Sequence, residues 1–462
     1  MAVMKLARSN SVMTGAMSGG NRYPAWLSWA VMAIVMASPL PLASNRPVFW
    51  LLWASVIFFL LAMHMIGKAT RGEGLDAPLS SMKVFSAGCA AFILYGVLQT
   101  LRLPGLELPG GRISIAPDAT LLGVLRWTSY AVFFFLCVQV TKRRRRARRL
   151  AWAAFIFTGA YCALSLLVFR YLGEVAYLGP QNGYADFVTG SFINRNSFAN
   201  YAGMGFCLGL ALVLREMAQA GQDRSRIAWF FSPDGMKVGI MWIVLAMMAA
   251  AIISSASRMG VASTAAGAMV ISILVLKKYG SKWSVRLWFV LVGLFIVLLA
   301  GTLLVGQNLI ERMLFISQEG QNRAALYLQV IELIQERPVF GFGLDTFEIA
   351  FQSVHRPPVS PDYFWDKAHS TYLALWSEMG PVFGSIPPLL VLVLTVRILL
   401  ADLRQESDIL FSIVAFGVIV QNTLHSAVDF SLEIPANVYL FLFLLALAYG
   451  RKPSGNGRNE TR

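Results

Sequence analysis

The chain has 462 residues, of which 57% are hydrophobic and 14% are charged, and its mean hydropathy is +0.61. A soluble domain carries about 25% charged residues, so this composition excludes a water-soluble globular protein. The apolar residues form repeated runs of about 20 residues, long enough to cross a bilayer core, and they lack the alternation of a membrane β-barrel. The sequence therefore predicts an all-α polytopic membrane protein.

The net charge of +15 has its largest single source in the basic run at residues 142–149. A run of this kind between two apolar segments is typical of a cytoplasmic loop that sets orientation and contacts anionic lipid headgroups. We prefer this interpretation to nucleic-acid binding. The four cysteines lie in apolar segments without a CxxC pair, so we expect no disulfide framework, no metal site and no cofactor.

Hydropathy predicts about twelve spanning helices and one large loop. Their expected limits are 25–42, 48–67, 83–100, 121–140, 150–171, 197–214, 238–255, 259–276, 287–306, 371–396, 408–426 and 433–450. The corresponding domains are an N-terminal tail (1–24), helices one to nine (25–306), a loop domain (307–370), helices ten to twelve (371–450) and a C-terminal tail (451–462). Pro387 and Pro388 are expected to kink or break the tenth helix.

The distribution of basic residues predicts which side each loop occupies. Of the 39 Lys and Arg residues, 27 fall in segments on the same side as the N-terminus and 11 fall in the alternate segments. Because positive loops stay in the cytosol, both termini are expected to be cytoplasmic in a bacterial inner membrane. The loop 307–370 is then periplasmic, and its residues 323–336 carry apolar side chains at the spacing of an amphipathic helix.

Ionisable and polar side chains recur where apolar segments end on this outer side. Such groups are rare in an apolar chain unless they have a function. The candidates are Arg195, Asn196, Arg258, Arg323, His369, Tyr372, His425 and Asp429. Structural alternatives stay open for them: a capped helix start at 195–197, an interfacial side chain at 258, a surface salt bridge at 323, a histidine cap at 369 and a structural His–Asp pair at 425 and 429.

These residue types suit one kind of chemistry. No ATP or nucleotide sugar is available outside the cytosol, so a synthetic enzyme there needs a substrate that is already activated, such as a lipid-linked diphosphate. Guanidinium groups bind phosphates through permanent charge and paired hydrogen bonds. A histidine can deprotonate an acceptor hydroxyl near neutral pH.

At these segments the chain resembles the O-antigen ligase family of polytopic enzymes. The similar elements are Phe192–Asn196, Ser255–Arg258, Arg323 upstream of the stretch 337–343, and Ala368-His369-Ser370-Thr371-Tyr372 followed by Glu378-Met379-Gly380. The resemblance covers mainly residues 190–450, and the first five helices match by hydropathy alone. It implies about twelve helices with a large periplasmic loop, as in the C-type membrane glycosyltransferases.

The resemblance also implies roles for individual residues. Arg195, Arg258 and Arg323 would bind the diphosphate of an undecaprenyl-linked glycan, with Arg323 and His369 as the catalytic residues. His369 would activate the acceptor hydroxyl or orient the substrate. The remaining candidates would bind substrate: Asn196, Tyr372, His425 and Asp429.

Three functions remain open on the sequence alone. The first is a metal-independent glycosyltransferase of lipopolysaccharide biosynthesis that moves the glycan to lipid A–core. The second is a repeat-unit polymerase for O-antigen or exopolysaccharide, which uses the same donor but a second lipid-linked glycan as acceptor. The third is a transporter of lipid-linked or anionic solutes, although transporters tend to place charge near the bilayer midplane.

Overall fold

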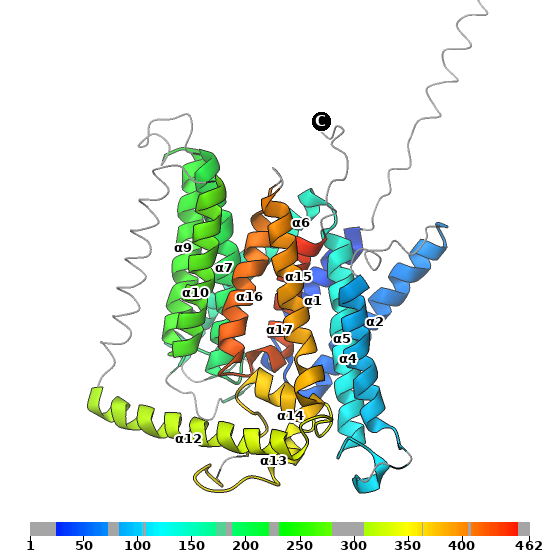
Figure 1. Cartoon of the computed structure of the whole chain (residues 1–462). Helices are drawn as coiled ribbons and strands as arrows, with labels where there is room; N and C mark the ends of the chain where they lie inside the picture. Colours follow the sequence, from blue (N-terminus) through cyan, green and yellow to red (C-terminus); the bar gives the residue numbers. More distant parts are fainter. Residues whose placement is uncertain are drawn as a thin grey trace, which may run out of the picture.

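The computed structural model describes most of the chain as a bundle of helices (Figure 1). The described residues are 25–72, 83–103, 105, 108–172, 175–176, 179–180, 187–220, 231–279, 309–362, 364–404 and 408–450. Within them, eight helices are long and apolar enough to cross a membrane. This finding confirms the predicted polytopic helical protein.

The eight candidate spans have the following bounds. They are α2 (Pro47–Ala69), α4 (Lys83–Thr100), α5 (Pro117–Thr141), α6 (Arg144–Leu172), α7 (Arg195–Ala220), α9 (Pro233–Ser254), α10 (Arg258–Tyr279) and α15 (Ile386–Leu403). Shorter apolar helices are α1 (Ala25–Ala37), α16 (Leu410–Ser426) and α17 (Pro435–Tyr449). The remaining elements are α12 (Leu309–Glu336), α13 (Phe347–Phe351), α14 (Thr371–Gly384), the 3₁₀ turns η1 (Leu42–Ser44), η2 (Pro109–Gly111) and η3 (Ser431–Glu433), and the paired strands β1 (Val175–Ala176) and β2 (Gly179–Pro180).

Ten of the twelve expected helices correspond to single helices of the structure. The helix expected at 287–306 lies outside the described residues. The helix expected at 371–396 is two helices, α14 and α15, which meet at Ser385. Pro387 and Pro388 lie in the first turn of α15, where backbone N–H groups have no helical partner, so these prolines begin a helix and do not kink one.

Within α14 the helical hydrogen bonds already fail before its end. Gly380 has φ +70°, and Pro381, which follows it, has no N–H to donate to the carbonyl of Ser377. That carbonyl instead accepts from the backbone N–H of Phe342 at 2.9 Å. The break in α14 thus supplies the acceptor that ties the stretch after Arg337 to this helix.

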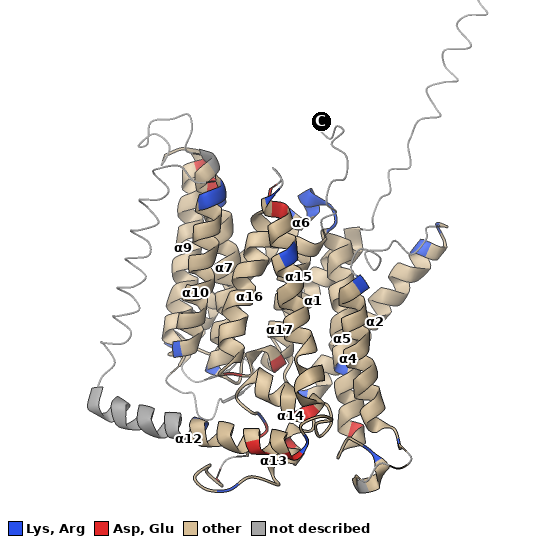
Figure 2. Cartoon of the chain, viewed as in Figure 1, with Lys and Arg blue, Asp and Glu red and all other residues tan. Residues whose placement is uncertain are grey.

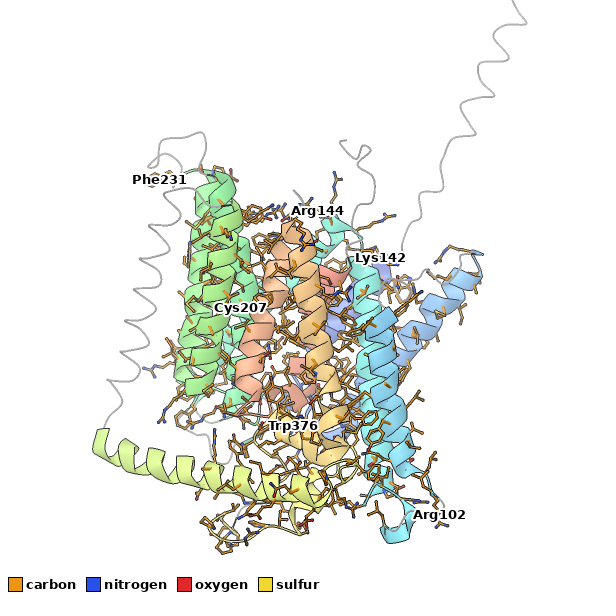
Figure 3. The ribbon with its side chains drawn as sticks, viewed as in Figure 1. Arg102, Lys142, Arg144, Cys207, Phe231 and Trp376 are labelled. Carbon is orange, nitrogen blue, oxygen red and sulfur yellow. The ribbon has the colours of Figure 1, made fainter. Side chains whose placement is uncertain are left out.

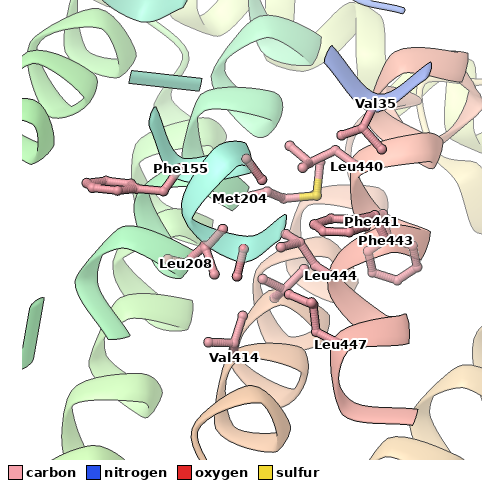
Figure 4. Close-up of a cluster of buried hydrophobic side chains, with 14 of the residues drawn as sticks. Val35, Phe155, Met204, Leu208, Val414, Leu440, Phe441, Phe443, Leu444 and Leu447 are labelled. Atoms are coloured by element: carbon pink, nitrogen blue, oxygen red, sulfur yellow. The ribbon is translucent and has the colours of Figure 1, made fainter. Parts of the chain in front are cut away.

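Helix α7 forms the centre of the bundle, and its candidate span is more enclosed than any other span of the described residues. It packs against α6, α9, α10 and α16, and its apolar side chains meet those of α17 in the core shown in Figure 4. In the outer helices, in contrast, a smaller share of each candidate span is buried. On α2, Leu52, Phe59 and Ile66 recur every seven residues and are exposed, as expected of a face turned toward lipid.

Helix α12 runs across one end of the bundle, together with α13 and α14 (Figure 1). We call this the loop end. Leu326, Val330 and Leu333 on one side of α12 are buried against α13 and the segment before α14, which confirms the amphipathic helix predicted at 323–336. The helix begins earlier than expected, at Leu309.

The opposite end of the bundle carries the basic run, and we call it the basic end. Lys142 and Arg144 lie there, whereas Arg102 and Trp376 lie toward the loop end (Figure 3). Most of the run is helical, because α6 begins at Arg144. Arg144 pairs with Asp408 at 2.5 Å and Arg148 pairs with Glu216 at 2.7 Å, so part of the run is tied to neighbouring helices and is not a free loop.

Candidate functional site

His369 lies at the loop end, directly before α14. Its backbone is left-handed with φ +52°, a conformation that non-glycine residues seldom adopt and that recurs at functional sites. Ser370 follows as the N-cap of α14, and its hydroxyl accepts from the N–H of Leu373. The imidazole meets the rings of Trp365 and Phe430 edge-on, with centroids at 5.8 and 5.1 Å.

The last turn of α16 brings His425 toward Asp429. The spacing of four residues predicted a shared helical face, and His425 Nδ1 lies 3.9 Å from Asp429 Oδ1. That separation is too long for a hydrogen bond. Asp429 instead accepts from the hydroxyl of Ser431 and, at 2.9 Å, from the amide of Asn196. Asp429 is therefore fixed by η3 and α7, while its charge still faces both histidines.

Asn196 connects three separate segments. Its Nδ2 donates to Asp429, and its Oδ1 accepts from the hydroxyl of Ser257 at 2.7 Å. Ser257 lies in the tight turn between α9 and α10, directly before Arg258. The prediction that Asn196 or Ser197 caps α7 is wrong, because Asn194 Oδ1 accepts the N–H of Asn196 at 2.7 Å. The side chain of Asn196 is therefore available for these two bridges.

Arg323 approaches the histidines from α12. One turn later on the same helix, the hydroxyl of Tyr327 donates to the carbonyl of His369 at 2.9 Å, which holds α12 over this segment. The charge of Arg323 acts on both His369 and His425. Arg323, His369, His425, Asp429 and Asn196 thus form one group, which we call the histidine group.

The other two arginines flank this group and are not shown to enter it. Arg258 is exposed at the first residue of α10, next to Ser257, which contacts Asn196. Arg195 precedes Asn196 in the chain, but its guanidinium lies over the ring of Phe187, 4.3 Å from the ring centroid. The common site predicted for all three guanidinium groups remains a prediction.

Two opposing effects set the protonation of His369. Burial lowers its pKa below the ordinary value of 6.5, and the nearby positive charge of Arg323 lowers the pKa further. Asp429 and Asp366 act in the opposite direction. The net shift is downward, so the imidazole is neutral and able to accept a proton at neutral pH.

Tyr372 contacts α16 and the cavity beside it. Its hydroxyl donates to the carbonyl of Thr423 on α16 at 3.0 Å, and its side chain lines a cavity between the helices. The resemblance placed Tyr372 among the substrate-binding residues, because it belongs to the stretch Ala368-His369-Ser370-Thr371-Tyr372. His369 precedes α14 and contacts Trp365 and Phe430, whereas Tyr372 is the second residue of α14 and contacts Thr423 on α16.

A second set of ionisable residues was missed in the sequence. Arg126 on α5 forms an ion pair with Asp345, which lies in the loop after Gly343. Lys367 pairs with Glu433 at 3.1 Å, and the carboxyl group of Glu378 lies close enough to interact electrostatically with both pairs. In the sequence, Arg126 indicated this set, since an arginine inside an apolar helix requires a partner of opposite charge. We call these five residues the buried charged cluster.

Figure 2 shows the two ends of the molecule by charge. Acidic and basic residues alternate along the ribbon around α12, α13 and α14 at the loop end, and Lys and Arg outnumber Asp and Glu at the basic end. The candidate groups therefore all belong to the loop end, on the opposite side from the basic run.

Comparisons with known proteins address the family directly. Residues 243–386 match the family model described as O-antigen ligase. No curated protein matches the chain. The matched segment contains Arg258, Arg323 and His369, and it ends before His425 and Asp429. Over these residues the chain therefore carries an O-antigen ligase domain, and this match supports the predicted resemblance to the O-antigen ligase family.

Proposed function

We propose that the protein is a metal-independent glycosyltransferase that works at the loop end, on the periplasmic face of a bacterial inner membrane. Its donor is a glycan on undecaprenyl diphosphate, and its acceptor is a hydroxyl group of lipid A–core. The observation that carries the proposal is the histidine group, in which a neutral imidazole, a guanidinium and a carboxylate from three separate segments act on one another. The family match supports glycan transfer in general.

Each part of the group has a task in this reaction. Arg323, assisted by Arg258 and Arg195, stabilises negative charge on the departing diphosphate, so the charge of a metal ion is not required. The acceptor oxygen attacks the anomeric carbon, and its proton passes to His369. The bond between that carbon and the diphosphate oxygen breaks, the lipid diphosphate leaves with the electron pair, and the configuration inverts.

Asp429 completes the arrangement. An imidazole that takes a proton becomes a cation, and burial beside Arg323 disfavours that cation. The carboxylate of Asp429, which Asn196 and Ser431 hold in place, offsets this effect when the proton arrives. Asn196 is therefore a positioning residue for Asp429.

The test replaces the proposed base. His369→Ala is expected to lower glycan transfer by purified protein in lipid vesicles by about 10²- to 10⁴-fold, the usual contribution of a general base. His355→Ala is the matched control, because His355 belongs to the same loop and stacks on Phe351 away from the group. Transfer at the wild-type rate by His369→Ala would contradict the proposal.

The same test in cells separates ligase from polymerase. Cells that lack the protein are complemented with wild type or His369→Ala, and the glycan left on the lipid carrier is measured. A ligase leaves long chains on the carrier and bare lipid A–core when it is inactive. A polymerase, which would use the same donor and the same residues, leaves single repeat units.

A further inference from the structure

A cavity of about 170 Å³ lies between α5, α14, α15, α16 and α17, next to the histidine group. Apolar side chains of α15 and α17 form one wall. Thr371 and Ser426 belong to the wall nearest the histidine group, because Thr371 donates its N–H to the carbonyl of Asp429 and Ser426 directly follows His425. The cavity and the histidine group therefore adjoin each other at Thr371 and Ser426.

The buried charged cluster occupies one side of this cavity. Arg126, Asp345, Glu378 and Glu433 line it, and Lys367 is paired with Glu433 behind them. The cluster contains three carboxyl groups and two cations. Burial raises the pKa of Glu378 to about 8, with Asp345 and Glu433 adding to the effect, so this carboxyl group is mostly protonated at neutral pH and can donate a hydrogen bond.

Two polar atoms in the cavity wall have no hydrogen-bond partner among the described residues. They are Oε1 of Glu433, whose other oxygen pairs with Lys367, and the hydroxyl of Tyr130 on α5. Buried polar atoms without partners destabilise a fold, so they indicate a site that a ligand completes. The residues that line the cavity thus include an acceptor oxygen on Glu433, a hydroxyl group on Tyr130 and a protonated carboxyl group on Glu378.

Size and charge restrict the ligand. An engineered protein cavity of about 150 Å³ holds one benzene ring, so this cavity accommodates a single six-membered ring. With Glu378 protonated, the remaining carboxylates balance the two cations, so the cavity lacks the net positive charge that would attract an anion such as the donor diphosphate. The aromatic faces of Trp127 and Tyr372 complement the C–H faces of a sugar, and the polar side complements its hydroxyl groups.

We propose that this cavity binds one neutral sugar ring of the acceptor and presents it to the histidine group, while the arginines on the other side hold the donor diphosphate. The inference rests on the proposed function, since it assigns the acceptor subsite of that reaction. Tyr130 and Glu433 are then acceptor-binding residues, and a carboxylate on the bound ring would meet repulsion from Glu433.

The first test removes one hydroxyl group from the cavity. Tyr130→Phe is expected to raise the KM for lipid A–core about fivefold to tenfold and to leave the KM for the lipid-linked donor unchanged. Tyr439→Phe is the matched control, because Tyr439 is also buried and its ring centroid lies 5.7 Å from that of Tyr130, but Tyr439 does not line the cavity.

The second test uses octyl glucoside and octyl glucuronide as inhibitors, since the two differ only by a carboxylate on the ring. The glucoside is expected to compete with lipid A–core and not with the donor, and the glucuronide is expected to compete at least about tenfold less well. In Glu433→Gln, the two compounds are expected to inhibit with more similar strength, because the charge that repels the glucuronide is removed. Equal inhibition by octanol would assign the cavity to a hydrocarbon chain and overturn the proposal.

The remaining outcomes separate this inference from the proposed function. An unchanged acceptor KM in Tyr130→Phe, or a raised donor KM in its place, overturns the acceptor site while transfer by the wild type stands. Absence of transfer by the wild type overturns the proposed function and the acceptor site together. Loss of activity in Tyr439→Phe as well as Tyr130→Phe would show a packing effect and overturn the assignment of Tyr130.

Discussion

At the scale of single residues, His369 combines a left-handed backbone conformation with a buried ring nitrogen that has no hydrogen-bond partner among the described residues. His369, whose φ is +52°, lies between the loop and the N-cap residue of α14, and this nitrogen is Nδ1. Arg323 and Asp429 act on its pKa with opposite signs. The pH dependence of transfer therefore reports on both neighbours.

Transfer by the wild type is expected to fall as the pH decreases through the lowered pKa of His369, below 6.5, because the protonated imidazole cannot accept a proton. Asp429→Asn removes the charge that raises this pKa, so the acid limb is expected to move to lower pH. Arg323→Gln removes a charge that lowers it, so the acid limb is expected to move to higher pH. Profiles of kcat/KM measure both shifts, and movement in the same direction would contradict the assignment.

At the scale of elements, the connection between the loop and α14 depends on a glycine. Gly341 has φ +68°, and a Cβ placed there would lie 2.4 Å from the carbonyl oxygen of Glu378. The close approach permits the hydrogen bonds from Phe342 and Gly343 to the carbonyls of Ser377 and Glu378. Since Glu378 belongs to the buried charged cluster, the same contact fixes one wall of the cavity.

Gly341→Ala is expected to destabilise this connection by at least about 1–2 kcal/mol, the cost of a left-handed conformation for a residue with a Cβ, and to lower transfer. Gly110→Ala provides the matched control, because Gly110 has φ +70° but its Cβ would meet nothing within 4 Å. Thermal unfolding and transfer assays on the two variants measure the difference. Equal losses of stability and transfer in the two variants would show that backbone strain alone causes them and that the close contact with Glu378 does not.

At the scale of the whole molecule, charge divides the bundle into two unlike ends. The basic end carries the run at 142–149, and the loop end carries the histidine group and the buried charged cluster (Figure 2). Positive segments are retained in the cytosol during insertion. We therefore propose that the loop end is periplasmic, where lipid-linked glycans become accessible after export.

Single cysteines in a cysteine-free background test this orientation. Ser353→Cys near α13 is expected to react with a membrane-impermeant maleimide in cells whose outer membrane is permeabilised. Arg145→Cys at the basic end is expected to react only after lysis. Both positions are exposed, so accessibility to solvent is comparable. The reverse labelling pattern would contradict the proposed topology.

Hydropathy predicted α2, α5 and α10 to within a few residues, because the length of a bilayer-crossing helix follows from the local run of apolar residues alone. The pairing of Arg126 with Asp345 joins residues far apart in the sequence and depends on how α5 meets the loop. The same holds for Asn196, whose chain position suggested a helix cap and whose side chain bridges Ser257 and Asp429. Local patterns predicted the candidate residues, and long-range packing decides which of them meet.

Two residues of α4 hold the segment around Phe340 and Glu378 in place. Gln99 on α4 donates to the carbonyls of Phe340 and Glu378 and accepts from the N–H of Leu344, and Tyr95 donates to Phe340. These two residues lie outside the segment 243–386 that carries the family signature. The signature segment is therefore not a transplantable module. In a chimaera that exchanges this segment between relatives, the host α4 is expected to need Gln99 and Tyr95, or residues with the same donors and acceptor, to hold the segment in place.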